Sequence, residues 1–241
     1  SPKRPPSMAV GRKSAPAFPA LPPSMAVEDL EYLKNHLRWY ILRGMRKAGL
    51  PALSIALVDD QQLVWAEGFG YADRERRVAA TPETVYQIGS ITKVVNALAV
   101  MQLVEQGKLS LDEPIGKLLP DLANPQVLEG FDASGEPKLR PAKKPITLRH
   151  LMTHTAGYCY DVWNGDMGKY QEKTGIPNIF SCQNAALKGP IMSDPGTRWE
   201  YGINIDFVGK AVEAVSGKKL DVYLRDNMFA PLGMNDTGFK I

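Results

Sequence analysis

Gln87-Ile88-Gly89-Ser90-Ile91-Thr92-Lys93 stands where the pattern of apolar residues changes period. After it, Val94, Leu98 and Met101 recur at spacings of three and four until Gly107. This spacing is that of one helix face, and glycine is a common residue just past a helix end. The sequence therefore predicts a helix that begins near Ser90.

Ser90 and Lys93 are three residues apart, so a helix would place both side chains on one face. The Lys93 amine could then reach the Ser90 hydroxyl. Free N–H groups at a helix start favour negative charge, which would support an oxyanion and lower the pKa of a nearby lysine. These arguments predict a neutral Lys93 that accepts a proton from Ser90. Ser-x-x-Lys alone is nevertheless a common coincidence on solvated helices.

The segments on either side predict an α+β fold, with an antiparallel central sheet flanked by helices and an all-helical region. Apolar residues from Leu30 to Met45 predict a helix, and residues 53–58 and 63–66 predict a hairpin ended by Gly68 and Gly70. Residues 118–145 are rich in Pro and Gly and are expected to be irregular. Further helices are expected near 147–152, 206–215 and 220–228.

Residues 1–27 are rich in Pro, Ser and Ala and contain Pro-Pro-Ser-Met-Ala-Val twice, so we expect a disordered or tag-like segment. Residues 28–241 form the folded part. Its 44% hydrophobic content suffices for a core, and a net charge of +3 gives no basic face for nucleic acid. Without a long apolar run or a signal sequence, the expected location is cytoplasmic, with no membrane partner. Cys159 and Cys182 are predicted to be structural thiols.

Five stretches resemble the superfamily of class C β-lactamases, penicillin-binding proteins and family VIII carboxylesterases, including its statin side-chain acyltransferase. They are Gly89-Ser-Ile-Thr-Lys93, residues 103–114, Ile146-Thr-Leu-Arg-His-Leu-Met-Thr-His-Thr-Ala-Gly157, Asp194-Pro-Gly196 with Tyr201-Gly-Ile-Asn204, and Pro231-Leu-Gly-Met234. The resemblance implies a serine enzyme in which Ser90 is the nucleophile. It also implies that Lys93 and Tyr201 handle protons, and that Gly89, Tyr160 and Asn204 bind substrate.

One departure from the β-lactamase pattern concerns Asn204. β-Lactamases carry Tyr-x-Asn, whereas Ile203 occupies that place here and Asn204 follows one residue late. We therefore predict an esterase or acyltransferase that forms an acyl-enzyme from small carboxylic esters or thioesters, without a cofactor. The alternatives are a β-lactamase, a D-Ala-D-Ala peptidase, or a non-catalytic scaffold.

The family's third motif should follow Tyr201, but Lys173-Thr174-Gly175 precedes it and is predicted to be a surface loop. We therefore expect the C-terminal part of the domain to be absent from this chain, with a missing segment or a second chain completing the site. The sequence does not give the oligomeric state. His150 and His154 have the spacing of metal ligands, but no third ligand follows at a recognisable distance, so no metal site is predicted.

Overall fold

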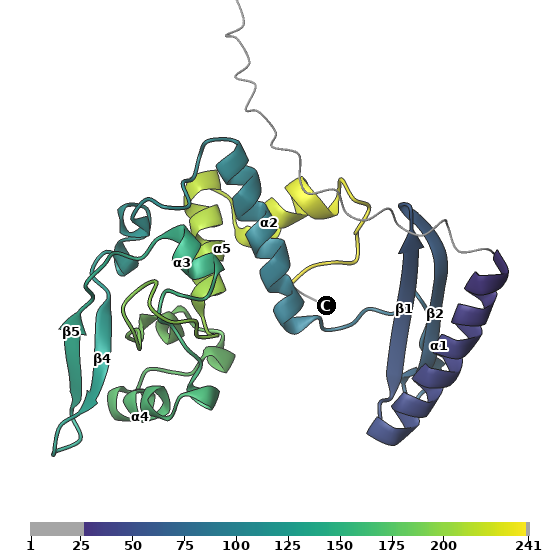
Figure 1. Ribbon diagram of the computed structural model, residues 1–241, viewed down its shortest axis with the longest axis horizontal. Coiled ribbons are helices and arrows are strands. Elements are labelled where there is room, and N and C mark those ends of the chain that lie inside the picture. Colours follow the sequence, from purple (N-terminus) through teal and green to yellow (C-terminus); the bar gives the residue numbers. More distant parts are fainter. Residues whose placement is uncertain (1–26, 240–241) are drawn as a thin grey trace, which may run out of the picture. The chain divides into compact units, whose positions relative to one another are not determined.

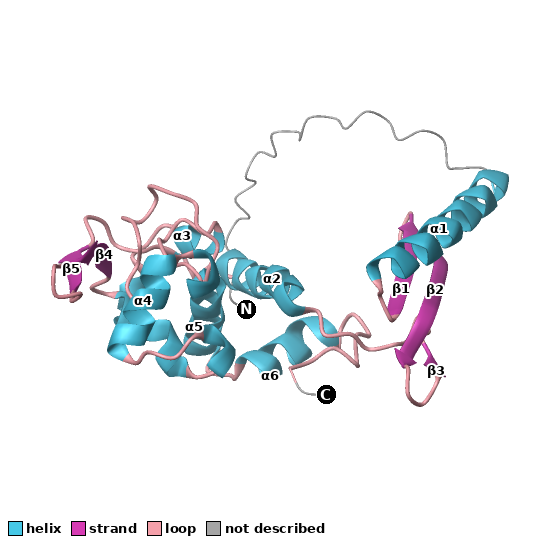
Figure 2. Cartoon of the chain, turned by 90° about the horizontal axis from the view of Figure 1, so that it is seen from below, coloured by secondary structure: helices cyan, strands magenta, loops and turns pink. Residues whose placement is uncertain are grey.

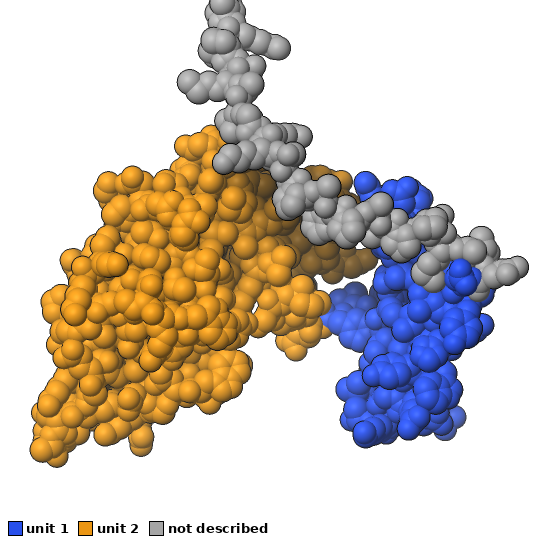
Figure 3. Space-filling view, viewed as in Figure 1, with its two compact units in different colours: residues 1–86 blue, residues 87–241 orange. Residues whose placement is uncertain are grey.

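The computed structural model describes residues 27–239, which fall into two compact units, residues 1–86 and residues 87–241 (Figure 3). We describe each unit by itself. The expectation for residues 1–27 concerns a segment outside the described residues, apart from Val27. Helices and antiparallel strands occur together in the chain (Figure 2), which confirms the α+β class.

The first unit consists of α1 (Val27–Ala48), β1 (Ala52–Asp59), β2 (Gln62–Asp73) and β3 (Val78–Ala79). The strands form an antiparallel sheet in the order β1-β2-β3 (Figure 2). Asp60 and Gln61 connect β1 to β2 with φ angles of 45° and 62°, the left-handed region that two-residue hairpin turns require. The predicted helix and hairpin are confirmed.

The predicted end of the second strand at Gly68 and Gly70 is wrong, because β2 continues to Asp73. A Cβ atom on Gly68 would lie 2.3 Å from the Ala80 carbonyl oxygen, and one on Gly70 would lie 2.2 Å from that of Pro51. Both glycines therefore permit close backbone approach inside the sheet rather than ending the strand.

One face of this sheet is covered by α1. Ile41 and Met45 of the helix are buried in a cluster with Trp65 and Phe69 of β2. Burial of four large side chains stabilises the packing by removing apolar area from water. The spacing of four between the two helix residues is the amphipathic pattern that the sequence showed.

The second unit is mainly helical, with one two-stranded sheet (Figure 1). Its regular elements are α2 (Thr92–Glu105), β4 (Gln126–Phe131), β5 (Pro137–Pro141), α3 (Leu148–Met152), α4 (Gly165–Thr174), α5 (Asn204–Ser216) and α6 (Leu220–Leu224), with 3-10 turns between them and a π-helical turn at Arg225–Phe229. Among the described residues, 27–239, no helix is long and apolar enough to cross a membrane.

The main core of this unit lies between α2 and α5. Val100 and Leu103 of α2 and Val208 and Val212 of α5 are almost completely buried there. A row of apolar side chains on another side of α2, which includes Val94, is exposed. Packing thus fixes the rotation of α2 about its axis, and with it the direction of the residues at its start.

Two predictions for this unit are wrong. Residues 118–145 contain the antiparallel hairpin of β4 and β5, in which Gly130 takes φ +125° at a register shift and Pro141 pairs with Gln126 at the end of the ladder. Lys173-Thr174-Gly175 is not a loop but the end of α4, with Gly175 in the left-handed conformation as the C-cap.

Candidate active site

Ser90 lies in a single 3-10 turn, Gly89–Ile91, immediately before α2. Its side chain is exposed, and Lys93 Nζ donates a hydrogen bond of 3.1 Å to Ser90 Oγ. Gly89 has φ +51°, a left-handed conformation that costs glycine little. The predicted pairing of Ser90 with Lys93 is therefore present, with the serine one turn ahead of the α-helix proper.

Tyr201 approaches this pair from the loop before α5. Lys93 Nζ lies 4.9 Å from the centre of the Tyr201 ring and 5.7 Å from that of Tyr160. Gly202 fixes the backbone here, since a Cβ on it would lie 2.5 Å from backbone atoms of Cys159. The three residues predicted to be catalytic thus come together with Tyr160, although Tyr201 lies more than 100 positions after Ser90 and Lys93 in the chain.

The charges of this cluster are distributed differently from the prediction. Burial lowers the pKa of Lys93, but hydrogen bonding to Tyr201 and Tyr160 and their negative charge outweigh it, so the pKa lies above its usual value. Burial raises the pKa of Tyr201, yet hydrogen bonds with Ser90 and Lys93 and the charge of Lys93 bring it below its usual value. Lys93 is therefore the charged partner, and Tyr201 is the group that loses a proton more easily.

Asn204 does not reach the surface of the site. Its side chain is fully buried, and Nδ2 lies 3.2 Å from His154 Nδ1, 3.2 Å from the Tyr158 carbonyl oxygen and 3.4 Å from that of Glu200. The structure thus gives it an internal position rather than the predicted contact with substrate. Because an amide nitrogen donates hydrogen bonds and does not accept them, His154 Nδ1 is the acceptor in its contact with Asn204, and the neutral ring carries its proton on Nε2.

His154 links this buried amide to Tyr201, because the two rings are 4.7 Å apart. Burial and the charge of Lys93 lower the pKa of His154, which favours the neutral ring. The backbone of His154 has φ +55°, a rare conformation for a residue with a side chain. The sequence analysis predicted that His154 is not a metal ligand, and it did not predict this contact with Tyr201.

His150 has a separate structural role at the start of α3. Thr147 and His150 form a capping box, in which each side chain accepts a hydrogen bond from the other residue's backbone N–H. Within residues 27–239, no three His, Cys, Asp or Glu side chains are grouped as metal ligands. Cys159 is buried and Cys182 is exposed, and both are free thiols.

Aromatic rings extend the site beyond Tyr201. Trp163 and Trp199 lie with ring centres 5.7 Å and 6.3 Å from that of Tyr201, and Tyr160 lies at 5.6 Å. The sequence analysis missed both tryptophans. Their closeness in sequence to Tyr160 and Tyr201 was the available signal.

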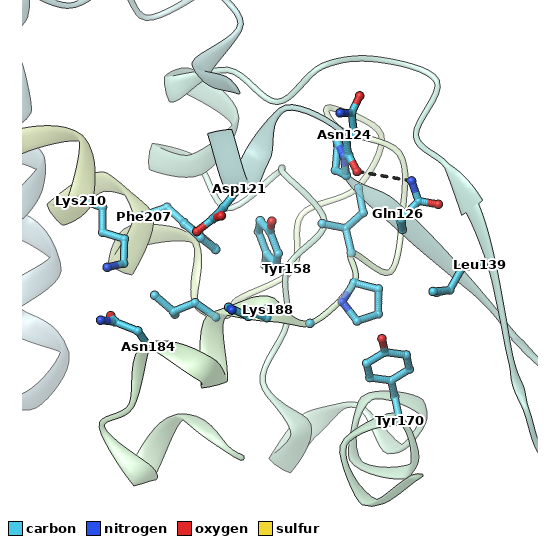
Figure 4. Close-up of a pocket in the computed structure, with 15 residues that line it drawn as sticks. Asp121, Asn124, Gln126, Leu139, Tyr158, Tyr170, Asn184, Lys188, Phe207 and Lys210 are labelled. Atoms are coloured by element: carbon cyan, nitrogen blue, oxygen red, sulfur yellow. Dashed lines mark hydrogen bonds between the residues drawn. The ribbon is translucent and has the colours of Figure 1, made fainter. Parts of the chain in front are cut away.

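A cavity of about 460 Å³ lies elsewhere in this unit (Figure 4). Tyr158, Phe207, Lys188, Lys210 and Asp121 are among its lining residues, whereas Ser90, Lys93 and Tyr201 are not. The three residues predicted to be catalytic therefore lie outside this cavity.

Comparison with known proteins identifies the family of this chain. The family model described as "Beta-lactamase" matches residues 37–241. The chain belongs to the beta-lactamase family. This establishes the resemblance that the motifs around Ser90 and Tyr201 predicted.

Relatives within the beta-lactamase family include acyltransferases and esterases. The chain is 42% identical over 161 residues to Acyltransferase mokF of Monascus pilosus, which covers 66% of this chain and 39% of that protein. It is 30% identical over 207 residues to Esterase EstB of Burkholderia gladioli, covering 82% and 48% of the two chains. Unliganded simvastatin synthase (LovD) from Aspergillus terreus has a TM-score of 0.72 at 33% identity, covering 82% and 52%. The chain thus spans about half or less of the length of these proteins.

Proposed function

We propose that this chain carries the catalytic serine of an esterase or acyltransferase that works through an acyl-enzyme. The observation that supports this most is the hydrogen bond of 3.1 Å from Lys93 to Ser90 Oγ, beside Tyr201. A nucleophilic serine needs a proton acceptor within reach, and this cluster supplies one. The substrates are small-molecule carboxylic esters or thioesters, as the acyltransferase and esterase names of relatives suggest.

The chemistry follows from the pKa directions at the site. Tyr201, in its phenolate form stabilised by Lys93, accepts the proton of Ser90 while Oγ attacks the ester carbonyl carbon. The backbone N–H of Ser90 supports the resulting oxyanion. When the C–O bond breaks, Tyr201 returns that proton to the departing alcohol. Water or an alcohol then gives a proton to Tyr201 and attacks the acyl carbon. The bond between the acyl group and Ser90 Oγ breaks, and Oγ takes the proton from Tyr201.

The position of Asn204 supports esters over lactams as substrates. An asparagine that recognised the amide of a β-lactam would need to face Ser90, whereas Asn204 is buried behind His154. We therefore retain the ester and thioester assignment, with Gly89 and Tyr160 at the substrate side of the site.

Labelling tests the nucleophile directly. A fluorophosphonate probe should react with the chain, and mass spectrometry should locate the label on Ser90. Ser90→Ala should abolish both labelling and hydrolysis of p-nitrophenyl acetate, while Ser110→Ala, a change at another exposed serine, should alter neither. Equal labelling of the Ser90→Ala variant would refute the assignment.

A further inference from the structure

Two exposed tryptophans stand beside the proton-transferring tyrosine. Trp163 is 71% exposed and Trp199 is 65% exposed, although each lies in contact range of the Tyr201 ring. Tryptophan carries a large apolar surface and is enriched where proteins bind other molecules. Apolar area presented next to a nucleophile is therefore a candidate for substrate contact.

The two tryptophans belong to separate groups of rings that share Tyr201. Trp163 lies 5.8 Å from Tyr160, and Trp199 lies 6.3 Å from His154. Among the described residues, no ring contact joins Trp163 to Trp199 directly. An ester also has two substituents, one on each side of its carbonyl. Aromatic surface at two separate places beside Tyr201 suits that shape.

A hydrogen bond connects the segments that carry these rings. Asn164 Nδ2 donates to Glu200 Oε1 over 2.8 Å, and Trp163 and Trp199 each precede one of these residues in the chain. Asn164 is also held as the N-cap of α4, where its Oδ1 accepts from the Met167 backbone N–H. The two tryptophans are therefore attached to backbone held in a defined arrangement, which suits recognition of a rigid group.

The charge of the site limits what these rings can bind. Exposed aromatic groups often bind cations, quaternary ammonium groups in particular. Here Lys93 Nζ already lies over the rings of Tyr201 and Tyr160, at 4.9 Å and 5.7 Å. A second cation on the faces of these two tyrosine rings would lie close to the Lys93 ammonium group, so a neutral apolar group fits there better than an ammonium group.

We infer that Trp163 and Trp199 form the specificity surface of the site, and that this surface selects uncharged esters with a bulky apolar group on the acyl or alcohol side. The inference rests on the proposed function, because it assumes that an ester carbonyl is presented to Ser90. It adds the substrate class and the residues that recognise it.

Equilibrium binding to the Ser90→Ala variant tests this without requiring turnover. We would measure dissociation constants by saturation-transfer difference NMR for 1-naphthyl acetate and for isopropyl acetate. Trp163→Ala and Trp199→Ala should each weaken binding of 1-naphthyl acetate about tenfold, which corresponds to about 1.4 kcal/mol. Isopropyl acetate should change little. Phe180→Ala is the matched control, since Phe180 is 75% exposed in the same unit and none of its ring contacts involves Tyr201.

A pair of isosteric esters tests the charge argument. Acetylcholine and 3,3-dimethylbutyl acetate have nearly the same shape, but only the first carries a positive charge. We expect the neutral ester to bind at least about fivefold more tightly, because Lys93 disfavours a second cation. Tighter binding of acetylcholine would overturn the assignment to uncharged esters.

Two controls separate this inference from the proposed function. Trp163→Phe and Trp199→Phe should restore part of the binding, and circular dichroism should show that every variant is folded. Fluorophosphonate labelling of Ser90 in the unaltered chain reports on the nucleophile alone. If Ser90 is labelled but the tryptophan variants bind 1-naphthyl acetate normally, the inference is wrong and the proposed function stands. If the tryptophans bind the ester but Ser90 is not labelled, the catalytic assignment is wrong.

Discussion

Lys93→Met should raise the pKa of Tyr201, because it removes both a hydrogen bond and the positive charge beside the phenol. The separation of 4.9 Å between Nζ and the ring centre gives an attraction of about 3 kcal/mol at an effective dielectric constant of about 20, and about 1 kcal/mol at about 80. Tyr201 is partly exposed, so the smaller figure is nearer. With about 1.4 kcal/mol for each pKa unit, the pKa should rise by about 0.7.

NMR of the chain with ¹³Cζ-labelled tyrosine measures this pKa without requiring catalysis. The nine tyrosines give separate titrations, and Tyr201→Phe identifies the signal that belongs to Tyr201. In the unaltered chain this signal should titrate below 10, the ordinary value for tyrosine. Lys188→Met serves as a control, because it removes another lysine of the same unit that has no part in the pKa of Tyr201.

The rate of Ser90 acylation should follow the same titration. Since the phenolate is the proton acceptor, the rate should rise as the pH increases through the pKa of Tyr201 and then level off. Lys93→Met should move that rise to higher pH. A Tyr201 signal at or above pKa 10 in the unaltered chain, or one that Lys93→Met leaves unchanged, would refute the charge distribution that we describe.

Three further outcomes follow from packing and ion pairs. Gly202→Ala should lower the free energy of unfolding in urea by about 1 to 3 kcal/mol and reduce labelling of Ser90. Gly168→Ala should do neither, because no atom lies within 4 Å of a Cβ added at Gly168; equal stability of the two variants would contradict the packing argument. Hydrogen bonds from Arg140 hold the pKa of Asp194 at about 2, below its ordinary 3.8. The stability that this ion pair adds is therefore present above about pH 4 and is lost as the pH falls towards 2. Asp194→Asn should lower the urea midpoint at pH 7 and not at pH 2. Asn204→Ala should cost about 1 to 3 kcal/mol, because it leaves buried acceptors unpaired; an unchanged midpoint would refute that role.

The spacing of apolar residues in the sequence was enough to predict elements whose structure depends on one helix face or one turn. The spacing from Leu30 to Met45 predicted α1, and the pattern after Ser90 predicted the start of α2. Helical spacing also explains why Ser90 and Lys93 meet. The hairpin of β4 and β5 was missed because Gly130 and Pro141 are unfavourable inside strands, and only the register of the pair shows that they occupy a bulge and a terminal position.

The buried position of Asn204 differs from the contact with substrate that was predicted for it. The sequence predicts a helix from about residue 206, and contact of Asn204 with substrate is implied by the family resemblance alone. Because α5 begins at Asn204 instead, this residue lies on the same buried face as Phe207, Val208 and Ala211, at spacings of three, four and seven. The buried face of α5 therefore accounts for the internal position of Asn204, which the family resemblance did not indicate.

The protonation state of Lys93 depends on contacts that no local pattern contains. The start of α2 favours negative charge, and the sequence analysis took this as a reason for Lys93 to become neutral. Two phenol rings brought in by Tyr160 and Tyr201 instead keep it charged. The same positive environment then stabilises both anions of the proposed reaction, the Tyr201 phenolate before the attack and the substrate oxyanion after it. The negative charge moves from the Tyr201 phenolate to the substrate oxyanion, and Lys93 and the helix start favour it at both positions. The proton can therefore transfer without creating an unfavourable charge at either position.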